Sequence, residues 1–427
     1  MSFGPGLGRL SLNDRFSTQI VLVKKVILVE AWLIELAKGI GKFFLNPALY
    51  WFLFILTVAS YFRIKRERYD FGIKIFPKFI EWHRTWLVSL ISGILISAVI
   101  ISVGMVFSYE TLLVLALSFV ILSISTRFTL LSPSYTLGLT FLILFFAPYL
   151  IDMQNIIDYS LLYERSLPAL AVLAGLLLFV ESLLIKRTEK QDVFPRIELS
   201  DRGVWVGEQQ IKRLTVVPML MLVPEGLITS FAPWWPYLSI GETSLGLVLI
   251  PFLLGFHYKA KGHFHQDAIY KLAKANTFLA TGILLIAVGG VFVPYLSLAA
   301  IILAIIGKEY LNYRYREGDR LRRPYYQPHL KGLRVIGILP ESPADRLEIE
   351  IGEIIYRVDG RNVLTSQAFY EALQGSGAYI KMEVLNHDEE VRFVQCSLYE
   401  GEHHSLGFQF AEEPFKARRE RRDNNVS

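Results

Sequence analysis

Long apolar runs separated by short charged stretches dominate the first three quarters of the chain. From residue 43 onward, nine such runs approach the length of about 20 residues that a helix needs to cross a bilayer. They cover residues 43–62, 86–107, 111–126, 135–151, 167–185, 214–231, 236–256, 276–293 and 295–311. Two pairs of runs are separated by very short turns, one near Tyr109 and one near Pro294. Each pair could instead form a re-entrant element. The pattern predicts an α-helical multi-pass membrane domain over residues 43–311, with about seven to nine spans.

A more polar stretch precedes these runs. Residues 20–44 are apolar but are interrupted by charged side chains at Lys24, Lys25, Glu30, Glu35, Lys38 and Lys42. This mixture is typical of an amphipathic helix that lies in the membrane interface. We therefore expect residues 1–42 to form an N-terminal extension that contains an interfacial helix.

The pattern changes again at Gly332, where short apolar segments alternate with turn signals. Ser342 and Pro343 are suited to begin a helix, and Asp359-Gly360 favours a hairpin turn. Strands are expected at 333–339, 352–358, 379–385 and 391–398, and a helix at 366–373. The pattern predicts a small mixed α/β module over residues 332–411. A basic linker at 312–331 would precede it, and a basic, disordered tail at 412–427 would follow.

The order of these elements resembles that of a bacterial PDZ domain. The motifs that carry the resemblance are Ser342-Pro343-Ala344, Gly352-Glu353-Ile354-Ile355 and Val358-Asp359-Gly360. A PDZ domain holds a peptide C-terminus on a Gly-Leu-Gly-Phe-like loop that precedes the first of these strands. The best match here, Ser405-Leu406-Gly407-Phe408-Gln409-Phe410, follows the last strand instead. The resemblance therefore implies a circularly permuted PDZ domain.

The same resemblance implies where a peptide would bind. A partner segment would add a strand to the open edge of residues 406–410, and Gly407 would let backbone N–H groups approach the peptide carboxylate. The implied binding residues are Leu406, Gly407, Phe408 and Phe410 from the strand, with Ala368 and Ala372 from the helix. The alternative is that residues 406–408 only close the core of the module beside an unused groove.

Composition excludes an ordinary soluble enzyme. Of the 427 residues, 53% are hydrophobic and only 19% are charged. The single cysteine, Cys396, excludes an internal disulfide and suits a reducing compartment. Because Cys396 falls in an expected strand, we interpret it as a buried structural thiol.

The distribution of charge predicts the orientation in the membrane. Four basic stretches, at 63–84, 186–213, 259–274 and 308–323, alternate with loops that are acidic or lack Lys and Arg. The positive-inside rule places the basic stretches, and with them the module, in the cytoplasm. We interpret the segment Arg63–Arg68 and the tail Lys416–Arg422 as contacts for anionic lipid headgroups, and expect no nucleic-acid binding. Trp234 and Trp235 in an opposite loop suit an interface anchor.

Signatures of catalysis and of cofactor binding are missing from the sequence. It has no His-Glu-x-x-His pair, no Gly-x-Ser-x-Gly elbow and no Walker-type phosphate loop. His263 and His265 are two residues apart without an evident third ligand, so we expect no metal. Neither an enzymatic activity nor a cofactor is predicted.

Two carboxylates lie inside apolar runs. Glu225, between Pro224 and Gly226, would sit in a broken helix, which is how many transporters build ion sites. Glu181 is close to Lys186, and we interpret it as a side chain that reaches the cytoplasmic interface. Glu225 therefore keeps a transport function open.

Both halves together resemble the MinJ family of division topology factors of Gram-positive bacteria. The runs that carry this resemblance are Phe43–Trp51, Arg63–Arg68, Ser397–Tyr399 and His403–Gly407. The resemblance implies a non-enzymatic membrane adaptor at the division septum and poles. It would bridge a DivIVA-like scaffold to a MinD-like ATPase, so placing the MinC division inhibitor, and would meet other membrane proteins of the division machinery. A transporter with a regulatory PDZ sensor and an adaptor for regulated membrane proteolysis remain the alternatives.

Overall fold

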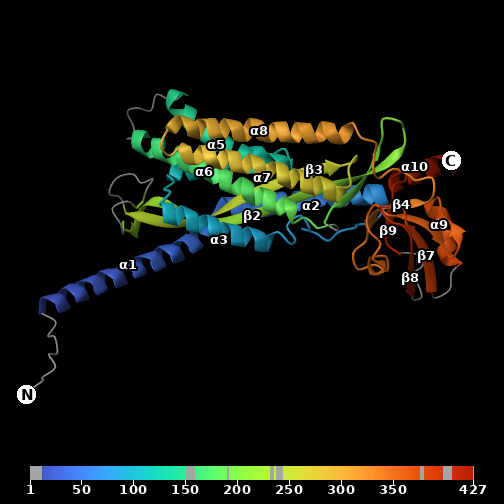
Figure 1. Ribbon diagram of the computed structural model, residues 1–427, viewed down its shortest axis with the longest axis horizontal. Helices are drawn as coiled ribbons and strands as arrows, with labels where there is room; N and C mark the ends of the chain where they lie inside the picture. Colours follow the sequence, from blue (N-terminus) through green and yellow to red (C-terminus); the bar gives the residue numbers. More distant parts are fainter. Residues whose placement is uncertain are drawn as a thin grey trace, which may run out of the picture.

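The computed structural model describes residues 12–150, 159–189, 192–230, 235–236, 244–375, 379–397 and 406–426. A bundle of helices encloses a long β-hairpin, and a small α/β module is attached at one end (Figure 1). The bundle helices are α1 (Leu12–Leu45), α2 (Pro47–Phe71), α3 (Trp86–Val103), α4 (Tyr109–Ser123), α5 (Pro133–Leu150), α6 (Tyr159–Lys186), α7 (His265–Gly289) and α8 (Pro294–Arg320), with a 3₁₀ turn η1 (Phe128–Leu131).

Five helical segments of the described chain are long and apolar enough to cross a membrane. These are Pro47–Phe71, Trp86–Val103, Ser166–Lys186, His265–Gly289 and Pro294–Arg320. Helices α4 and α5 are apolar but shorter. Local signals fix the helix ends: Asn46 Oδ1 accepts a hydrogen bond from the Ala48 N–H at the start of α2, and Gly72 ends that helix in a left-handed conformation. The prediction of a membrane domain is confirmed at this coarse level.

Two of the predicted spanning helices are wrong. Residues 214–231 and 236–256 fall largely in β2 (Trp205–Ile228) and β3 (Leu245–Ala260), which pair antiparallel, while the short β1 (Phe194–Leu199) pairs with the start of β2. The register places Pro218 opposite Pro251. Prolines at these positions would break a helix. Length and hydropathy did not distinguish spanning helices from buried strands here, because a buried strand is also a continuous apolar run.

The outer edge of β2 is hydrogen-bonded by α3 and by the segment that connects α3 to α4. The Leu220 N–H donates to the Ser97 Oγ of α3 at 2.8 Å, and the Phe107 N–H donates to the Leu222 carbonyl at 2.8 Å. Helix α3 approaches β2 so closely that a Cβ at Gly93 would collide with the Pro218 carbonyl oxygen. Protein groups rather than lipid therefore satisfy these parts of the strand edge, which makes a hairpin compatible with an apolar bundle.

The C-terminal module has the strands and the helix that the sequence predicted. They are β4 (Leu333–Ile338), β5 (Ile354–Val358), α9 (Ser366–Gln374), β7 (Tyr379–Leu385) and β8 (Val391–Ser397). The short β6 (Arg361–Asn362) and the 3₁₀ turn η2 (Asp345–Leu347) are additional, and β9 (Phe408–Phe410) and α10 (Phe415–Val426) follow. The sheet order is β8-β7-β5-β4-β9, and β6 pairs with β5. Cys396 on β8 is half-buried and forms no disulfide.

Three local expectations differ from the structure. Ser342 begins no α-helix, because its hydroxyl donates to the Leu339 carbonyl at 2.6 Å and only the short η2 follows. Helix α8 continues to Arg320, into the predicted linker. The tail that was predicted to be disordered contains α10, whose Phe415 ring packs against the backbone of Gly72 at the end of α2.

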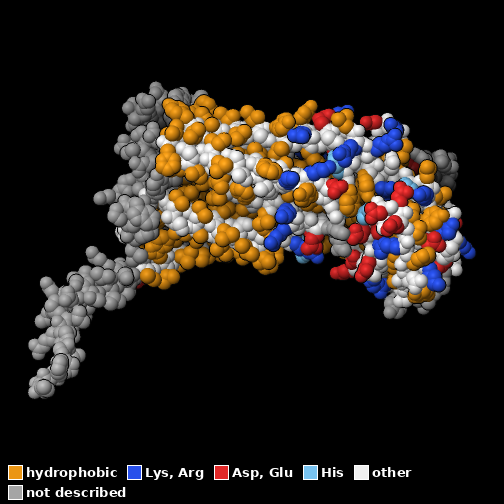
Figure 2. Space-filling view, viewed as in Figure 1, with side chains coloured by type: hydrophobic (Ala, Val, Ile, Leu, Met, Phe, Trp, Pro, Cys, Tyr) orange, Lys and Arg blue, Asp and Glu red, His pale blue; other side chains and the backbone are white. Residues whose placement is uncertain are grey.

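The module packs directly against the bundle. The Gly207 N–H of β2 donates to the Tyr326 carbonyl at 2.8 Å, and Gln209 Nε2 donates to the Ile336 carbonyl of β4 at 2.6 Å. Tyr326 and Ile336 belong to the same hydrophobic cluster as the bundle core. In Figure 2 apolar side chains cover the bundle, and the charged ones gather at the end that carries the module.

The four basic stretches of the sequence meet at this same end. Arg66 of α2 donates to the Ile197 carbonyl of β1 at 3.1 Å, and the Lys261 N–H donates to Asp319 of α8 at 2.9 Å. Hydrogen bonds thus link segments that lie far apart in sequence. The predicted clustering of basic stretches on one side, beside the module, agrees with this arrangement.

Candidate functional site

The candidate peptide site is the edge strand β9. It pairs with β4 through Val335 opposite Phe410 and Ile338 opposite Phe408, and it ends the sheet. The rings of Phe408 and Phe410 turn inward and pack edge-on against Phe369 of α9, at centroid distances of 6.1 and 5.3 Å. Alternate side chains thus anchor β9 in the core, while its backbone borders the open side of the sheet.

Gly407 occupies a position that only glycine fits. Its φ is +103°, and a Cβ there would collide with the Ser342 side chain. Two hydrogen bonds attach the neighbouring loop to this residue and the one before it. The Leu339 N–H donates to the Gly407 carbonyl at 2.9 Å, and the Ala344 N–H donates to the Leu406 carbonyl at 2.8 Å. Leu406 itself is fully buried in the module core.

A cavity of about 860 Å³ lies along β9. Its walls come from β9, α9, α10 and the end of α2. The lining residues are Asp70, Phe71, Ile73, Ile197, Leu339, Ser366, Tyr370, Gly407, Phe408, Gln409, Phe410, Glu412, Phe415, Arg418 and Arg419. Three of the predicted site residues, Gly407, Phe408 and Phe410, therefore border one cavity.

Helix α9 presents Ser366 and Tyr370 to this cavity, and not the predicted alanines. Ala372 is buried in the module core, and Ala368 is half-buried outside the lining. The helix begins after Thr365, whose hydroxyl accepts the Ala368 N–H at 3.2 Å. Residues four apart share a helix face, so this cap could have identified Ser366 and Tyr370. The role of all these residues in peptide binding stays a prediction.

Glu412 links α9 to the C-terminal helix. Its carboxylate accepts hydrogen bonds from the Ser366 N–H at 2.8 Å and the Ser366 hydroxyl at 2.6 Å, and pairs with Arg418 at 2.9 Å. Burial, and then the charge of Glu412, raises the pKa of the Tyr370 hydroxyl, so this hydroxyl stays protonated at neutral pH. Helix α10 thereby closes one side of the groove.

A buried ion pair lies inside the bundle. Lys308 Nζ of α8 lies 2.5 Å from Glu181 Oε1 of α6, 2.6 Å from Asn276 Oδ1 and 3.0 Å from the Tyr258 hydroxyl. Glu181 and Lys308 are both fully buried, and Ser132 donates to the second Glu181 oxygen at 2.5 Å. The interpretation of Glu181 as an interfacial side chain is therefore wrong, because it faces α8 across the bundle.

Glu225 does not sit in a broken helix. It lies in β2 at an irregularity of the register between Pro224 and Ile228, with φ of +65°, and its side chain is exposed. Near it, Trp235 is buried and donates its indole N–H to the Ile101 carbonyl at 2.7 Å, so it is no interface anchor. Trp234 lies outside the described residues. The described carboxylate that is buried near this end of the hairpin is Glu35 of α1, which is 3% exposed and pairs with Lys38 at 2.9 Å. Glu225 itself is not enclosed, as the transport hypothesis would require of it.

The two histidines of the β3–α7 loop have structural partners. His263 Nδ1 lies 2.8 Å from Asp319 Oδ1, and His265 Nδ1 lies 2.8 Å from the Tyr326 hydroxyl. Across the described residues, no three His, Cys, Asp or Glu side chains come together in a way that could hold a metal ion. The histidines hold the loop to the end of α8 and to the segment that leads into the module.

Much of the basic segment after the first span is neutralised within the protein. Arg63 is buried, with its guanidinium 2.5 Å from Glu67 and 2.9 Å from Glu81, and Arg66 pairs with Asp70 at 3.1 Å. The sequence-based assignment of Arg63 to lipid headgroups is therefore wrong, because this side chain is buried, whereas for the partly exposed Arg66 it stays a prediction. Carboxylates of the protein, which the sequence-based assignment did not pair with these arginines, are the partners of both side chains.

Comparison with known proteins identifies similar chains. No protein-family model matches the sequence. The chain is 32% identical over 383 residues to the Bacillus subtilis (strain 168) protein named "Cell division topological determinant MinJ", and the match covers 90% of this chain and 96% of that protein. Proteins of Lacticaseibacillus paracasei and Lacticaseibacillus casei (strain BD-II), named "Probable cell division topological determinant MinJ", are 24% identical over 371 residues, covering 85% of this chain and 95% of each relative.

Proposed function

The chain belongs to the MinJ family of cell division topological determinants, and from this premise we propose that it is a membrane-held adaptor of division-site selection. In this proposal the module faces the cytoplasm at the septum and poles, where it bridges a DivIVA-like scaffold to a MinD-like ATPase and the MinC inhibitor. Other membrane proteins of the division machinery are further partners. The function is recruitment rather than turnover, and confinement to the membrane raises the effective concentration of such partners.

The packing of the module beside the basic end of the bundle is the observation that carries this proposal. Basic stretches next to membrane spans remain in the cytoplasm. The module is fixed to those stretches through Gly207, Gln209 and their hydrogen bonds to residues 326 and 336. A peptide groove at this end would face cytosolic partners within reach of the membrane surface.

We further propose that the module is a circularly permuted PDZ domain that binds peptides by strand addition. Support comes from β9 at the edge of the sheet, from α9 across the cavity and from the constrained Gly407. A peptide would pair with β9, with its carboxylate near the backbone of Leu406 and Gly407. Ser366 and Tyr370 would form the facing wall, and Ala368 and Ala372 would support α9 from behind.

A bulky side chain at Gln409 tests the groove. Gln409 is half-buried and lines the cavity, so Gln409→Trp fills the space beside β9. Gln395 lies on β8, the opposite edge strand of the same sheet, and is exposed, so Gln395→Trp is the matched control. Fluorescent fusions of both variants and of the parent chain are imaged in dividing cells, together with labelled scaffold and MinD-like partners.

The proposal predicts that all three fusions reach the membrane. The parent and Gln395→Trp should gather at septa and poles and recruit both partners, whereas Gln409→Trp should lose at least one of them. A parent fusion spread evenly over the membrane, with septa placed normally after deletion of its gene, would contradict the division function. If Gln409→Trp recruits both partners fully, peptide binding in the groove along β9 is contradicted, but the division function is not.

The alternatives receive less support. A transporter was suggested by a helix break at Glu225, and that residue is instead exposed on a strand. An adaptor for regulated proteolysis would use the same groove, but it predicts that substrate proteins accumulate on deletion while septa stay in place. The imaging experiment separates this outcome from the division function.

A further inference from the structure

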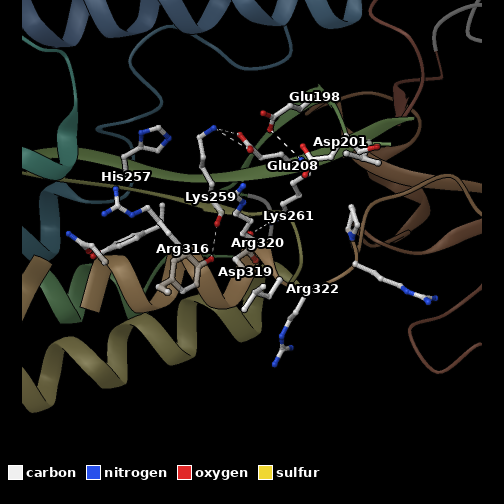
Figure 3. A pocket seen from close by; sticks show the side chains of 18 of the residues that line it. Glu198, Asp201, Glu208, His257, Lys259, Lys261, Arg316, Asp319, Arg320 and Arg322 are labelled. Carbon is white, nitrogen blue, oxygen red and sulfur yellow. Dashed lines mark hydrogen bonds and ion pairs between the residues drawn. The ribbon is translucent and has the colours of Figure 1, made fainter. Parts of the chain in front are cut away.

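A second cavity, of about 1130 Å³, opens at the basic end of the bundle (Figure 3). It lies between η1, the sheet of β1, β2 and β3, and the last turns of α8 with the segment that follows them. We call it the arginine cleft. Peptide binding at β9 makes no use of it, because the two cavities share no lining residue.

Three of the five carboxylates of the arginine cleft have close partners within the protein, and Glu198 has a more distant one, Lys261, at 3.9 Å. Glu208 pairs with Lys259 at 3.2 Å, and Glu309 pairs with Arg316 at 2.9 Å. Asp319 accepts hydrogen bonds from two backbone N–H groups and pairs with His263. Most of the negative charge that Figure 3 shows in the cleft is thus directed at fixed cationic or N–H groups.

The positive charge is larger than these pairs require. Eight Lys or Arg residues line the cleft, against five Asp or Glu residues. The guanidinium groups that have no ion-pair partner among the described residues are all on exposed arginines: Arg127, Arg202, Arg320, Arg322 and Arg323. Their planar donors match the oxygens of a phosphate group, which accepts two parallel hydrogen bonds from one guanidinium.

The cleft also adjoins the apolar surface of the bundle. Ile306, Tyr310 and Tyr313 of α8 are 63%, 57% and 58% exposed and form a stripe along that helix. Tyr313 lies four residues after Glu309 and three before Arg316, both in the cleft lining, so the stripe runs into its edge. Exposed tyrosines next to a basic pocket are typical of the level where lipid headgroups lie.

We propose that the arginine cleft binds a phosphate-bearing anion, and that this anion is the headgroup of an anionic phospholipid whose acyl chains lie along α8. The inference goes beyond the peptide groove and beyond recruitment of division proteins. It also moves the predicted lipid contact from Arg63 and Arg66, which are paired within the protein, to arginines that have no carboxylate partner in the described chain.

Native mass spectrometry of the full chain in detergent tests the proposal, with phosphatidylglycerol, phosphatidylcholine and inorganic phosphate added in separate arms. The cleft variant is Arg320→Gln/Arg322→Gln/Arg323→Gln. The control is Lys331→Gln/Arg361→Gln/Lys381→Gln, which removes the same charge from exposed positions in or next to the module, outside the cleft lining. A third variant, with lysine at 320, 322 and 323, keeps the charge and reports on folding.

The parent and control should retain phosphatidylglycerol in preference to phosphatidylcholine. The cleft variant should bind phosphatidylglycerol at least about tenfold more weakly, as expected for loss of several cationic contacts. The lysine variant should recover part of the binding, because it keeps the charge and loses the paired guanidinium donors. Equal binding by the cleft variant and the control, or no preference of the parent for phosphatidylglycerol, would overturn the site. Binding of inorganic phosphate without phosphatidylglycerol would overturn the lipid as its ligand.

Discussion

Replacement of Lys308 by methionine is expected to destabilise the bundle by about 3–5 kcal/mol, because it leaves a fully buried carboxylate without its charged partner. Lys308 Nζ makes its closest contact, 2.5 Å, with Glu181, and two further contacts with Asn276 and Tyr258. Among the residues that the structure describes, the variant keeps only the hydroxyl of Ser132 on the Glu181 carboxylate. Removing both charges, in Glu181→Met/Lys308→Met, should restore most of the stability. The free energy of unfolding often changes little when a buried ion pair is replaced by apolar side chains of similar size.

Unfolding in mixed detergent micelles, titrated with dodecyl sulfate and followed by tryptophan fluorescence, measures these free energies. Arg316→Met is the matched control, because it breaks an ion pair on the same helix whose members are 65% and 58% exposed. That control should change the free energy of unfolding by less than about 1 kcal/mol. Our reasoning is refuted if Lys308→Met unfolds at the same detergent fraction as Arg316→Met, or if the double variant is as unstable as the single one.

Glycine substitutions give two further predictions. Gly407→Ala should destabilise the module by more than about 1–3 kcal/mol, because it adds a collision with Ser342 to a strained φ. The control Gly360→Ala, at φ of +78° in open space, should cost only about 1–2 kcal/mol. Limited proteolysis of the module compares the two variants, and equal resistance to the protease would contradict the predicted collision. Gly93→Ala should push α3 away from β2 and cost about 1–3 kcal/mol, while Gly282→Ala, with no neighbour within 4 Å, should be tolerated. The yield of monodisperse protein on size exclusion reports this difference, and similar yields would mean that α3 and β2 do not pack as described.

The sequence predicted the module better than the bundle. In the module, strand periodicity and turn residues such as Asp359-Gly360 occur close together, so local chemistry determines most elements. In the bundle, the runs at 214–231 and 236–256 have the length and hydropathy of spanning helices. Pro218, Pro224 and Pro251 were the signal against helices. A hairpin is possible there only because a partner strand and the Ser97 hydroxyl of α3, which accepts the Leu220 N–H, satisfy the backbone, and these are tertiary features.

The candidate sites were partly accessible from the sequence. The motif at 405–410 identified the edge strand. Gly407 was singled out because it lacks a Cβ, and the structure adds that its φ is positive, at +103°. The opposite wall was misplaced by two residues, because the register of α9 depends on where Thr365 caps it. Glu181 with Lys308, 127 residues apart, and the arginine cleft, built from four separate segments, required the fold.

The side of the membrane on which the module lies is the most direct test of the account. With Cys396 replaced by serine, single cysteines are placed at Gln374, at the exposed end of α9, and at Ser230, at the opposite end of the molecule. A membrane-impermeant maleimide is then applied to intact and to permeabilised cells. The account predicts that the cysteine at 230 reacts in intact cells and the cysteine at 374 only after permeabilisation; labelling of position 374 in intact cells would contradict it.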